Sequence, residues 1–107
     1  MNDTDKLNRL IQGIGLARGE DLRDFDLRGA DLRGAKLRNA SLNGAMLDNA
    51  DLRNADLREV YFVGSSNFGT RFEGADLRGA DFSDTVLIGA DFGGADLSQA
   101  DLSGAEF

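Results

Sequence analysis

The chain has 107 residues, a length typical of one domain with a modest core. It contains neither Cys nor His, which excludes disulfides, thiolate chemistry and the commonest side chain for general base catalysis and metal binding. A formal net charge of −7, with 41% hydrophobic and 29% charged residues, is typical of a soluble globular protein and disfavours direct binding to nucleic acid or to an anionic membrane.

The first 19 residues differ in pattern from the rest of the chain. Between residues 3 and 14 four aliphatic side chains lie at helical spacing: Leu7, Leu10, Ile11 and Ile14. We expect residues 1–19 to form a short capping α-helix and a linker, because a helix of this length is marginal alone and needs a surface to cover. The chain carries neither a long apolar run nor a secretion signal, so we expect a cytoplasmic protein.

From residue 20 to residue 107 the sequence follows a five-residue period. Leu or Phe occupies every fifth position from Leu22 to Phe107, apart from Asn67, and Ala is the commonest residue two positions earlier. Neither a helix nor a strand keeps two apolar rows of this period on one side, so the chain must turn once per repeat. Two positions after each centre, thirteen of the seventeen sites from 24 to 104 are Gly or Asn, the residues that accept the positive φ of a type II turn.

Several of these repeats have a recognisable sequence. Ala-Asp-Leu-Arg-Gly at 30–34 and 75–79 and Ala-Asp-Leu-Arg-Asn at 50–54 resemble the pentapeptide repeat family, and the resemblance covers about residues 20–107. It implies an all-β solenoid, a right-handed quadrilateral β-helix in which four repeats make one coil. Eighteen repeats would then give about 4.5 coils and a rod roughly 21 Å long at a spacing of about 4.8 Å per coil.

A twenty-residue period assigns each centre to one of four walls. The first wall stacks Leu22, Leu42, Phe62, Phe82 and Leu102, and the second stacks Leu27, Leu47, position 67, Leu87 and Phe107. The third stacks Leu32, Leu52, Phe72 and Phe92, and the fourth stacks Leu37, Leu57, Leu77 and Leu97. The Phe residues thus form ladders on two opposite walls, where we expect neighbouring rings to stack.

Asn67 is the exception to the apolar centres. If Phe68 is the centre instead, the spacing becomes six residues from Phe62 and four to Phe72. This register predicts a bulge over residues 63–66, with Phe68 pointing inward and Asn67 outward. A tolerated irregularity and a bulge shaped for a partner are both compatible with the sequence.

The repeats run in register to Phe107 with no second capping element after them. We therefore expect apolar side chains and backbone edges of the last coil to be uncovered. Pairing with a second copy is the simplest way to bury them. This predicts an end-to-end homodimer through Leu102 and Phe107, an assembly that the family resemblance also implies.

Function is expected at outward positions, because the core is filled. Regular convex walls lack the concave pocket that an enzyme needs, so we expect no enzyme and assign no catalytic, cofactor-binding or metal-binding residues. The sequence favours a protein–protein interaction or scaffold module with an unidentified protein partner. Its candidate surface lies on the second wall, at Met46, Val86 and Ile88. A regular lattice that tolerates scattered exposed apolar residues is the alternative explanation.

The charge distribution supports a second hypothesis. Residues 1–60 have a net charge of −1 and residues 61–107 a net charge of −6. The second half thus carries about one net negative charge per 1.9 Å of rod, close to the value of about 1.7 Å for duplex DNA. Some pentapeptide repeat proteins protect or inhibit DNA gyrase as DNA-like acidic rods. The resemblance would assign that role to four acidic residues: Asp81, Asp91, Asp96 and Asp101. The shortness of the rod counts against it.

Overall fold

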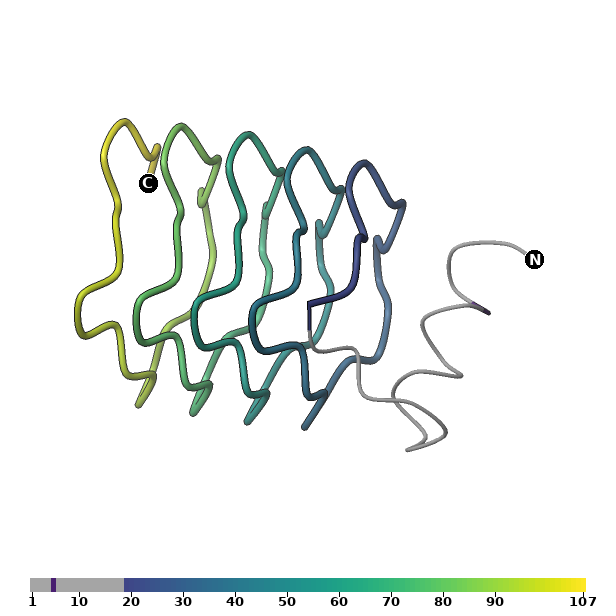
Figure 1. Cartoon of the computed structure of the whole chain (residues 1–107), viewed down its shortest axis with the longest axis horizontal. Coiled ribbons are helices and arrows are strands. Elements are labelled where there is room, and N and C mark those ends of the chain that lie inside the picture. The colour runs from purple at the N-terminus through teal and green to yellow at the C-terminus, as the bar shows by residue number, and fades with distance from the viewer. Residues whose placement is uncertain (1–4, 6–18) are drawn as a thin grey trace.

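The computed structural model describes Asp5 and residues 19–107. The expected helix over residues 3–14 therefore lies outside the described residues, apart from Asp5, which is helical. Figure 1 shows residues 19–107 as a solenoid whose coils stack along the long axis of the molecule.

Residues 19–107 contain isolated β-bridges in place of extended strands or helices. Every fifth residue from Asp21 to Glu106 forms a parallel bridge with the residue twenty positions away, so four bridges fall in each turn of the solenoid. These bridges define four walls, which coincide with those expected from the sequence. Wall one carries the ladder Asp21–Ser41–Tyr61–Asp81–Asp101, and wall two carries Asp26–Met46–Ser66–Val86–Glu106. Wall three carries Asp31–Asp51–Arg71–Asp91, and wall four carries Lys36–Asp56–Asp76–Asp96.

The corners between walls are tight turns. In a representative repeat, the amide of Ala30 donates to the carbonyl of Leu27 at 3.0 Å, and Gly29 between them has a φ of 68°. Every fifth residue from Asp24 to Gly104 has a positive φ. The type II turn predicted from the Gly and Asn positions is confirmed.

Backbone hydrogen bonds join each coil to the next. The amide of Leu32 donates to the carbonyl of Asp51 at 2.8 Å, and the amide of Asp51 donates back to the carbonyl of Ala30 at 2.9 Å. The amide of Gly34 adds a third bond, to Arg53, at 2.9 Å. This pattern satisfies the buried backbone groups inside the stack, as a packed interior requires.

The centres of the repeats fill the interior. The Leu and Phe centres from Leu22 to Leu87 are no more than 1% exposed. On wall one the rings of Phe62 and Phe82 stack at 4.5 Å and 7°, and on wall three those of Phe72 and Phe92 stack at 5.0 Å and 3°. Phe62 and Phe72 meet edge to face at 5.9 Å and 89° across the core. The predicted Phe ladders are confirmed, and their stacked and edge-to-face geometries are favourable ones for aromatic pairs.

The predicted bulge at residues 63–66 is wrong. Asn67 is 0% exposed and occupies the centre of its repeat, whereas Phe68 is 45% exposed. The turn explains why this register is preferred. With Asn67 at the centre, the positive φ falls on Gly69, at 65°, whereas a centre at Phe68 would place it on the β-branched Thr70.

Candidate functional site

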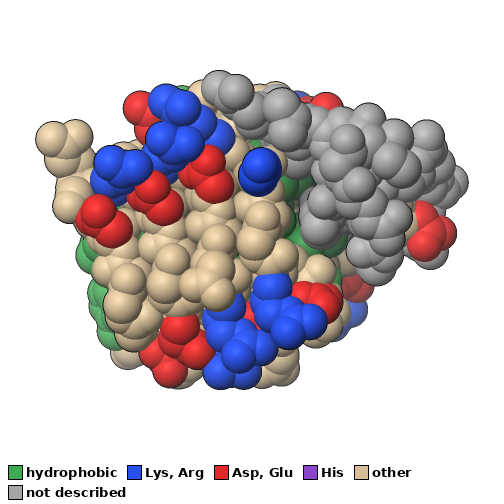
Figure 2. All heavy atoms as spheres, turned by 90° about the horizontal axis from the view of Figure 1, so that it is seen from below, with side chains coloured by type: hydrophobic (Ala, Val, Ile, Leu, Met, Phe, Trp, Pro, Cys, Tyr) green, Lys and Arg blue, Asp and Glu red, His purple; other side chains and the backbone are tan. Residues whose placement is uncertain are grey.

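The outward side chains of walls three and four are organised as ion pairs within single repeats. The Asp before a centre faces the Arg after it, as in Asp51 and Arg53, where Arg53 Nη2 donates to Asp51 Oδ2 at 2.6 Å and Nε donates to Oδ1 at 2.8 Å. The backbone amide of the Arg also donates to Oδ1, at 3.2 Å in this pair. Figure 2 shows rows of basic and acidic side chains lying side by side on one face of the molecule.

These pairs keep the carboxylates ionised. The hydrogen bonds from Arg33 lower the pKa of Asp31 to about 2. The pKa of Asp56 is also lowered, first by the side-chain hydrogen bond from Arg58. A hydrogen bond to the charged form of a carboxylate favours that form, so the paired Asp residues are weak bases at neutral pH.

Walls one and two have a different charge pattern from residue 41 onward. With their turns they comprise residues 41–50, 61–70, 81–90 and 101–107, and these segments contain no Lys or Arg. All Lys and Arg residues after position 40 lie on walls three and four: Arg53, Arg58, Arg71 and Arg78. These segments of walls one and two carry five acidic residues, which we call the acidic rim: Asp48, Asp81, Asp84, Asp101 and Glu106. Arg28, in the first coil of wall two, interacts electrostatically with Asp48.

Neutral donors hold several carboxylates of the acidic rim. Asp48 Oδ1 accepts hydrogen bonds from Ser66 Oγ at 2.7 Å and from the amide of Phe68 at 3.0 Å. The amide of Ser103 donates to Asp101 at 2.9 Å, and the hydrogen bonds from Ser103 lower the pKa of Asp101. These contacts order the carboxylates without cancelling their charge.

Between these carboxylates lies a cluster of apolar side chains, which we call the apolar patch: Met46, Phe68, Val86 and Ile88. Phe68 is 45% and Ile88 42% exposed, while Met46 and Val86 are half-buried. Ser66, beside Phe68, forms bridges with both Met46 and Val86, so the four residues occupy three neighbouring coils of wall two. Tyr61, 49% exposed, and Val63 lie on wall one in the same coil as Phe68.

The structure therefore keeps the three apolar residues predicted on wall two and adds Phe68 to them. The sequence interpretation missed Phe68 because it placed this ring in the core. Gly69 was the signal that could have corrected it. A Gly two positions after Asn67 fits the turn rule of the other repeats.

The four acidic residues predicted to mimic DNA do not share one face. Asp81 and Asp101 form a bridge with each other on wall one. Asp91 lies on wall three and Asp96 on wall four. Each of the four accepts a hydrogen bond from the amide two residues later, at 2.9 to 3.0 Å. These side chains thus close local turns as well as contributing charge.

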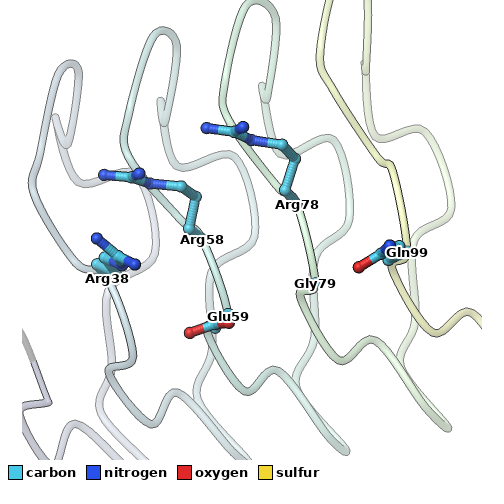
Figure 3. A pocket seen from close by; sticks show the side chains of 6 residues that line it. All are labelled: Arg38, Arg58, Glu59, Arg78, Gly79 and Gln99. Carbon is cyan, nitrogen blue, oxygen red and sulfur yellow. The ribbon is translucent and has the colours of Figure 1, made fainter.

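A groove of about 270 Å³ on wall four was not predicted. It is lined by Arg38, Arg58, Glu59, Arg78, Gly79 and Gln99. Figure 3 shows Arg58 and Arg78 extending in parallel from successive coils. Both are neutralised by Asp56 and Asp76, at 2.8 and 2.7 Å respectively. Arg38 follows Lys36 where the other repeats of this wall have an Asp, and its Nε is buried without a hydrogen-bond partner.

A family model described as pentapeptide repeats matches residues 21–64 and 68–104, in eight copies. The chain belongs to the pentapeptide repeat family. The interval that the match omits, residues 65–67, includes the repeat centre that is Asn67.

Two solved pentapeptide repeat structures are similar to this chain. Rfr23 from the cyanobacterium Cyanothece 51142 shares 28% identity with a TM-score of 0.66, over 83% of this chain and 57% of that one. The protein alr5209 from Nostoc Pcc 7120 shares 29% identity with a TM-score of 0.58, over 94% of this chain and 72% of that one. The chain thus spans little more than half the length of Rfr23. Both similarities support the right-handed β-helix. No curated protein matches the chain.

The end of this pentapeptide repeat solenoid places the two residues of the expected dimer contact differently. Leu102 is half-buried and packs against the core cluster. Phe107 is 72% exposed. The two side chains are therefore unequal in the apolar area that they present.

Two further kinds of site are absent from the described part of the chain. Among Asp5 and residues 19–107, no group of three or more acidic side chains is arranged to hold a metal ion. No helix within the same residues has the length and apolar character needed to cross a membrane.

Proposed function

We propose that this pentapeptide repeat protein is a non-enzymatic interaction module that binds a partner protein through the apolar patch. The observation that carries the proposal is the exposure of Phe68 and Ile88, at 45% and 42%, on a wall that has no Lys or Arg from residue 41 onward, whereas walls three and four carry ion pairs. Large exposed apolar side chains that cluster on one face mark an interaction site more often than singly scattered ones do.

The chemistry of the remaining surface supports a binding role over a catalytic one. Every Asp with a resolved pKa shift has its pKa lowered, because its carboxylate accepts hydrogen bonds from Arg or Ser two residues later. A general acid needs the opposite shift, and an acid–base pair needs two groups whose pKa values are pushed apart. The groove on wall four holds cations that are largely neutralised within their own repeats.

The test is affinity capture from an extract of the source organism with three forms of the immobilised protein. These are the wild type, the patch variant F68S/I88S, and a control variant R71Q/E73Q that removes an ion pair from wall three. We expect a protein retained by the wild type and the control to be lost with the patch variant. Identical retention by all three forms would contradict the proposal.

We further propose that two copies associate end to end through Leu102 and Phe107. The exposed ring of Phe107 supports this contact, as do the half-buried Phe92 and Leu97 of the same last coil. Burying such a surface against an identical one produces a closed, two-fold assembly.

The alternative function is that of an acidic rod that occupies the DNA-binding site of an enzyme such as DNA gyrase. The net charge of −6 in residues 61–107 supports it, and so does the bridge between Asp81 and Asp101. Its test is gyrase supercoiling, with and without a quinolone, against the wild type and a variant in which Asp81, Asp91, Asp96 and Asp101 become Asn. Protection or inhibition that is lost in the variant would favour the rod, and no effect at saturating protein would exclude it.

A further inference from the structure

We infer that the partner of the apolar patch is a basic amphipathic segment, with Lys and Arg side chains beside its apolar contact residues. This inference rests on the proposed function and specifies the chemistry of the partner. It follows from the combination of an exposed apolar surface with carboxylates that, from residue 41 onward, share their walls with no Lys or Arg. Arg28, one coil earlier on wall two, lies near Asp48.

The charged side chains are distributed unequally among the four walls. From residue 41 onward all four Arg residues lie on walls three and four, whereas walls one and two carry five acidic residues and no Lys or Arg. On walls three and four most carboxylates are already paired, for example Asp51 with Arg53 at 2.6 Å. The acidic rim is thus a set of carboxylates in segments without Lys or Arg, on the same two walls as the apolar patch and Tyr61.

Several carboxylates of the acidic rim lie close to the apolar patch. Asp48 Oδ1 lies 3.0 Å from the amide of Phe68, and Glu106 forms a bridge with Val86. Asp81 forms a bridge with Tyr61, which lies on wall one in the same coil as Phe68. The carboxylates therefore lie next to the apolar side chains on more than one side.

The negative charge of the acidic rim disfavours other partners at the apolar patch. A second copy that docked its own patch here would bring five carboxylates against five, and like charges that face each other across an interface disfavour association. Nucleic acid and anionic membranes are disfavoured for the same reason. A segment with flanking Lys and Arg instead meets opposite charge at the rim and apolar contacts at the centre.

The experiment uses synthetic 18-residue helical peptides as probes. One has a Leu face flanked by Lys, the second has the same Leu face flanked by Gln, and the third has it flanked by Glu. Binding of fluorescently labelled peptides is measured by anisotropy at several salt concentrations. The contact is mapped on the ¹⁵N-labelled protein by amide chemical shifts.

Three protein variants are compared with the wild type. F68S/I88S removes the large exposed apolar side chains, and D48N/D81N/E106Q neutralises rim residues while keeping their hydrogen-bonding oxygens. D56N/D76N is the matched control, because it neutralises two carboxylates on wall four, which lies opposite wall two in the order of the bridges.

We expect the Leu/Lys peptide to bind the wild type about tenfold more tightly than the Leu/Gln peptide, with weaker binding at higher salt. Amide shifts should gather at residues 46–48, 61–68 and 86–88. F68S/I88S should lose at least this factor, D48N/D81N/E106Q should bind both peptides alike, and the control should bind as the wild type does. The Leu/Glu peptide should bind most weakly.

Other outcomes separate the two proposals. If the Leu/Lys and Leu/Gln peptides bind equally and F68S/I88S still loses binding, the basic partner is refuted and the interaction site stands. If F68S/I88S binds the Leu/Lys peptide as the wild type does, general attraction between opposite charges accounts for the binding, and both proposals fail at this surface. Self-association of the wild type that F68S/I88S abolishes would identify a second copy as the occupant and refute the basic partner.

Discussion

At the scale of single residues, Asn67 provides the sharpest test of the register. It is fully buried, its Nδ2 donates to Ser65 Oγ at 2.8 Å, and its Oδ1 has no hydrogen-bond partner. A carboxylate at this position would be a buried charge without a cation, so we expect Asn67→Asp to lower the free energy of unfolding at pH 7 by about 3–5 kcal/mol.

The pH dependence of this variant has a defined sign. Burial raises the pKa of a carboxyl above its unfolded value of about 3.9, so the protonated form is favoured in the fold. The loss should therefore be smallest below pH 4 and grow as the pH rises, which urea denaturation at pH 4 and pH 7 measures. The control Ser41→Asp adds an Asp at an outward bridging position and should stay within about 0.5 kcal/mol of the wild type. An unchanged stability of Asn67→Asp at pH 7 would show that position 67 faces outward.

Phe68 supplies the complementary prediction. Because its ring is 45% exposed, Phe68→Ser should change the free energy of unfolding by no more than about 0.5 kcal/mol. The same kind of truncation at the buried Phe82, Phe82→Ala, should cost about 3–5 kcal/mol. Urea unfolding followed by far-UV circular dichroism compares the two. A loss at Phe68 as large as that at Phe82 would place Phe68 in the core.

These two residues show where reading the sequence succeeds and where it fails. The sequence predicted the buried Leu and Phe centres correctly because their period is uniform and apolar. At residues 67 and 68 two rules conflict, since burial of the larger apolar side chain favours Phe68 and turn chemistry favours Asn67. The hydrogen-bonded coil permits one register, and a positive φ on Gly69 is cheaper than one on Thr70. Exposing the Phe68 ring therefore costs less than losing the turn at Gly69 and the two bridges of Ser66.

At the scale of the repeat, the turn makes a prediction that depends on backbone conformation alone. Gly64 has a φ of 70°, and a Cβ added there would meet no atom within 4 Å, so Gly64→Ala tests strain without a steric clash. We expect it to destabilise the fold by about 1 kcal/mol. Glu59 has a φ of 59° at the equivalent position of its own repeat, so Glu59→Gly should stabilise by a similar amount. Equal unfolding midpoints for both variants in urea would contradict the role of the positive φ.

The ion pair within a repeat makes a prediction about titration. Arg33 lowers the pKa of Asp31 to about 2, so Arg33→Gln should return this pKa toward its ordinary value of 3.8. Because the pKa is lower in the folded protein, the pair stabilises the fold above the unfolded pKa and loses this effect as the pH falls from about 4 to 2. A pH titration followed by carboxyl ¹³C chemical shifts measures the pKa of Asp31 in the wild type and in Arg33→Gln. Asp96 is the internal control, since Ser98 is the main cause of its lowered pKa and Arg33→Gln should leave it unchanged. A pKa of Asp31 unaffected by Arg33→Gln would refute the pairing.

The pairing itself was only partly visible in the sequence. The alternation of Asp and Arg around each centre predicts that charges offset one another locally. It does not predict that Arg33 meets Asp31 through two hydrogen bonds at 2.8 and 2.9 Å, because that geometry depends on the turn after the bridge. The groove on wall four is a stronger case, since its lining residues come from four successive coils.

At the scale of the whole molecule, the arrangement of charge around the solenoid matters more than its distribution along the chain. Counting along the sequence predicts an acidic second half. Sorting the same residues by wall shows that the Arg residues after position 40 all lie on walls three and four, while walls one and two from residue 41 onward are acidic and apolar. The sequence contained this information once the twenty-residue period was known. The exposure of Phe68, which completes the apolar patch, required the structure.

The last prediction concerns the assembly of the solenoid through its C-terminal coil. Phe107 is 72% exposed, and a second copy would bury it against an identical ring, so we expect the molar mass from light scattering to rise toward a dimer with increasing concentration. Phe107→Asp should remain monomeric, because it removes apolar area and adds like charge, whereas F68S/I88S should dimerise as the wild type does. The acidic residues near this end repel one another, so raising the salt concentration should strengthen the dimer by screening that repulsion. A wild type that stays monomeric at high protein and high salt would refute this contact. Dissociation by F68S/I88S instead of Phe107→Asp would assign the dimer to the apolar patch.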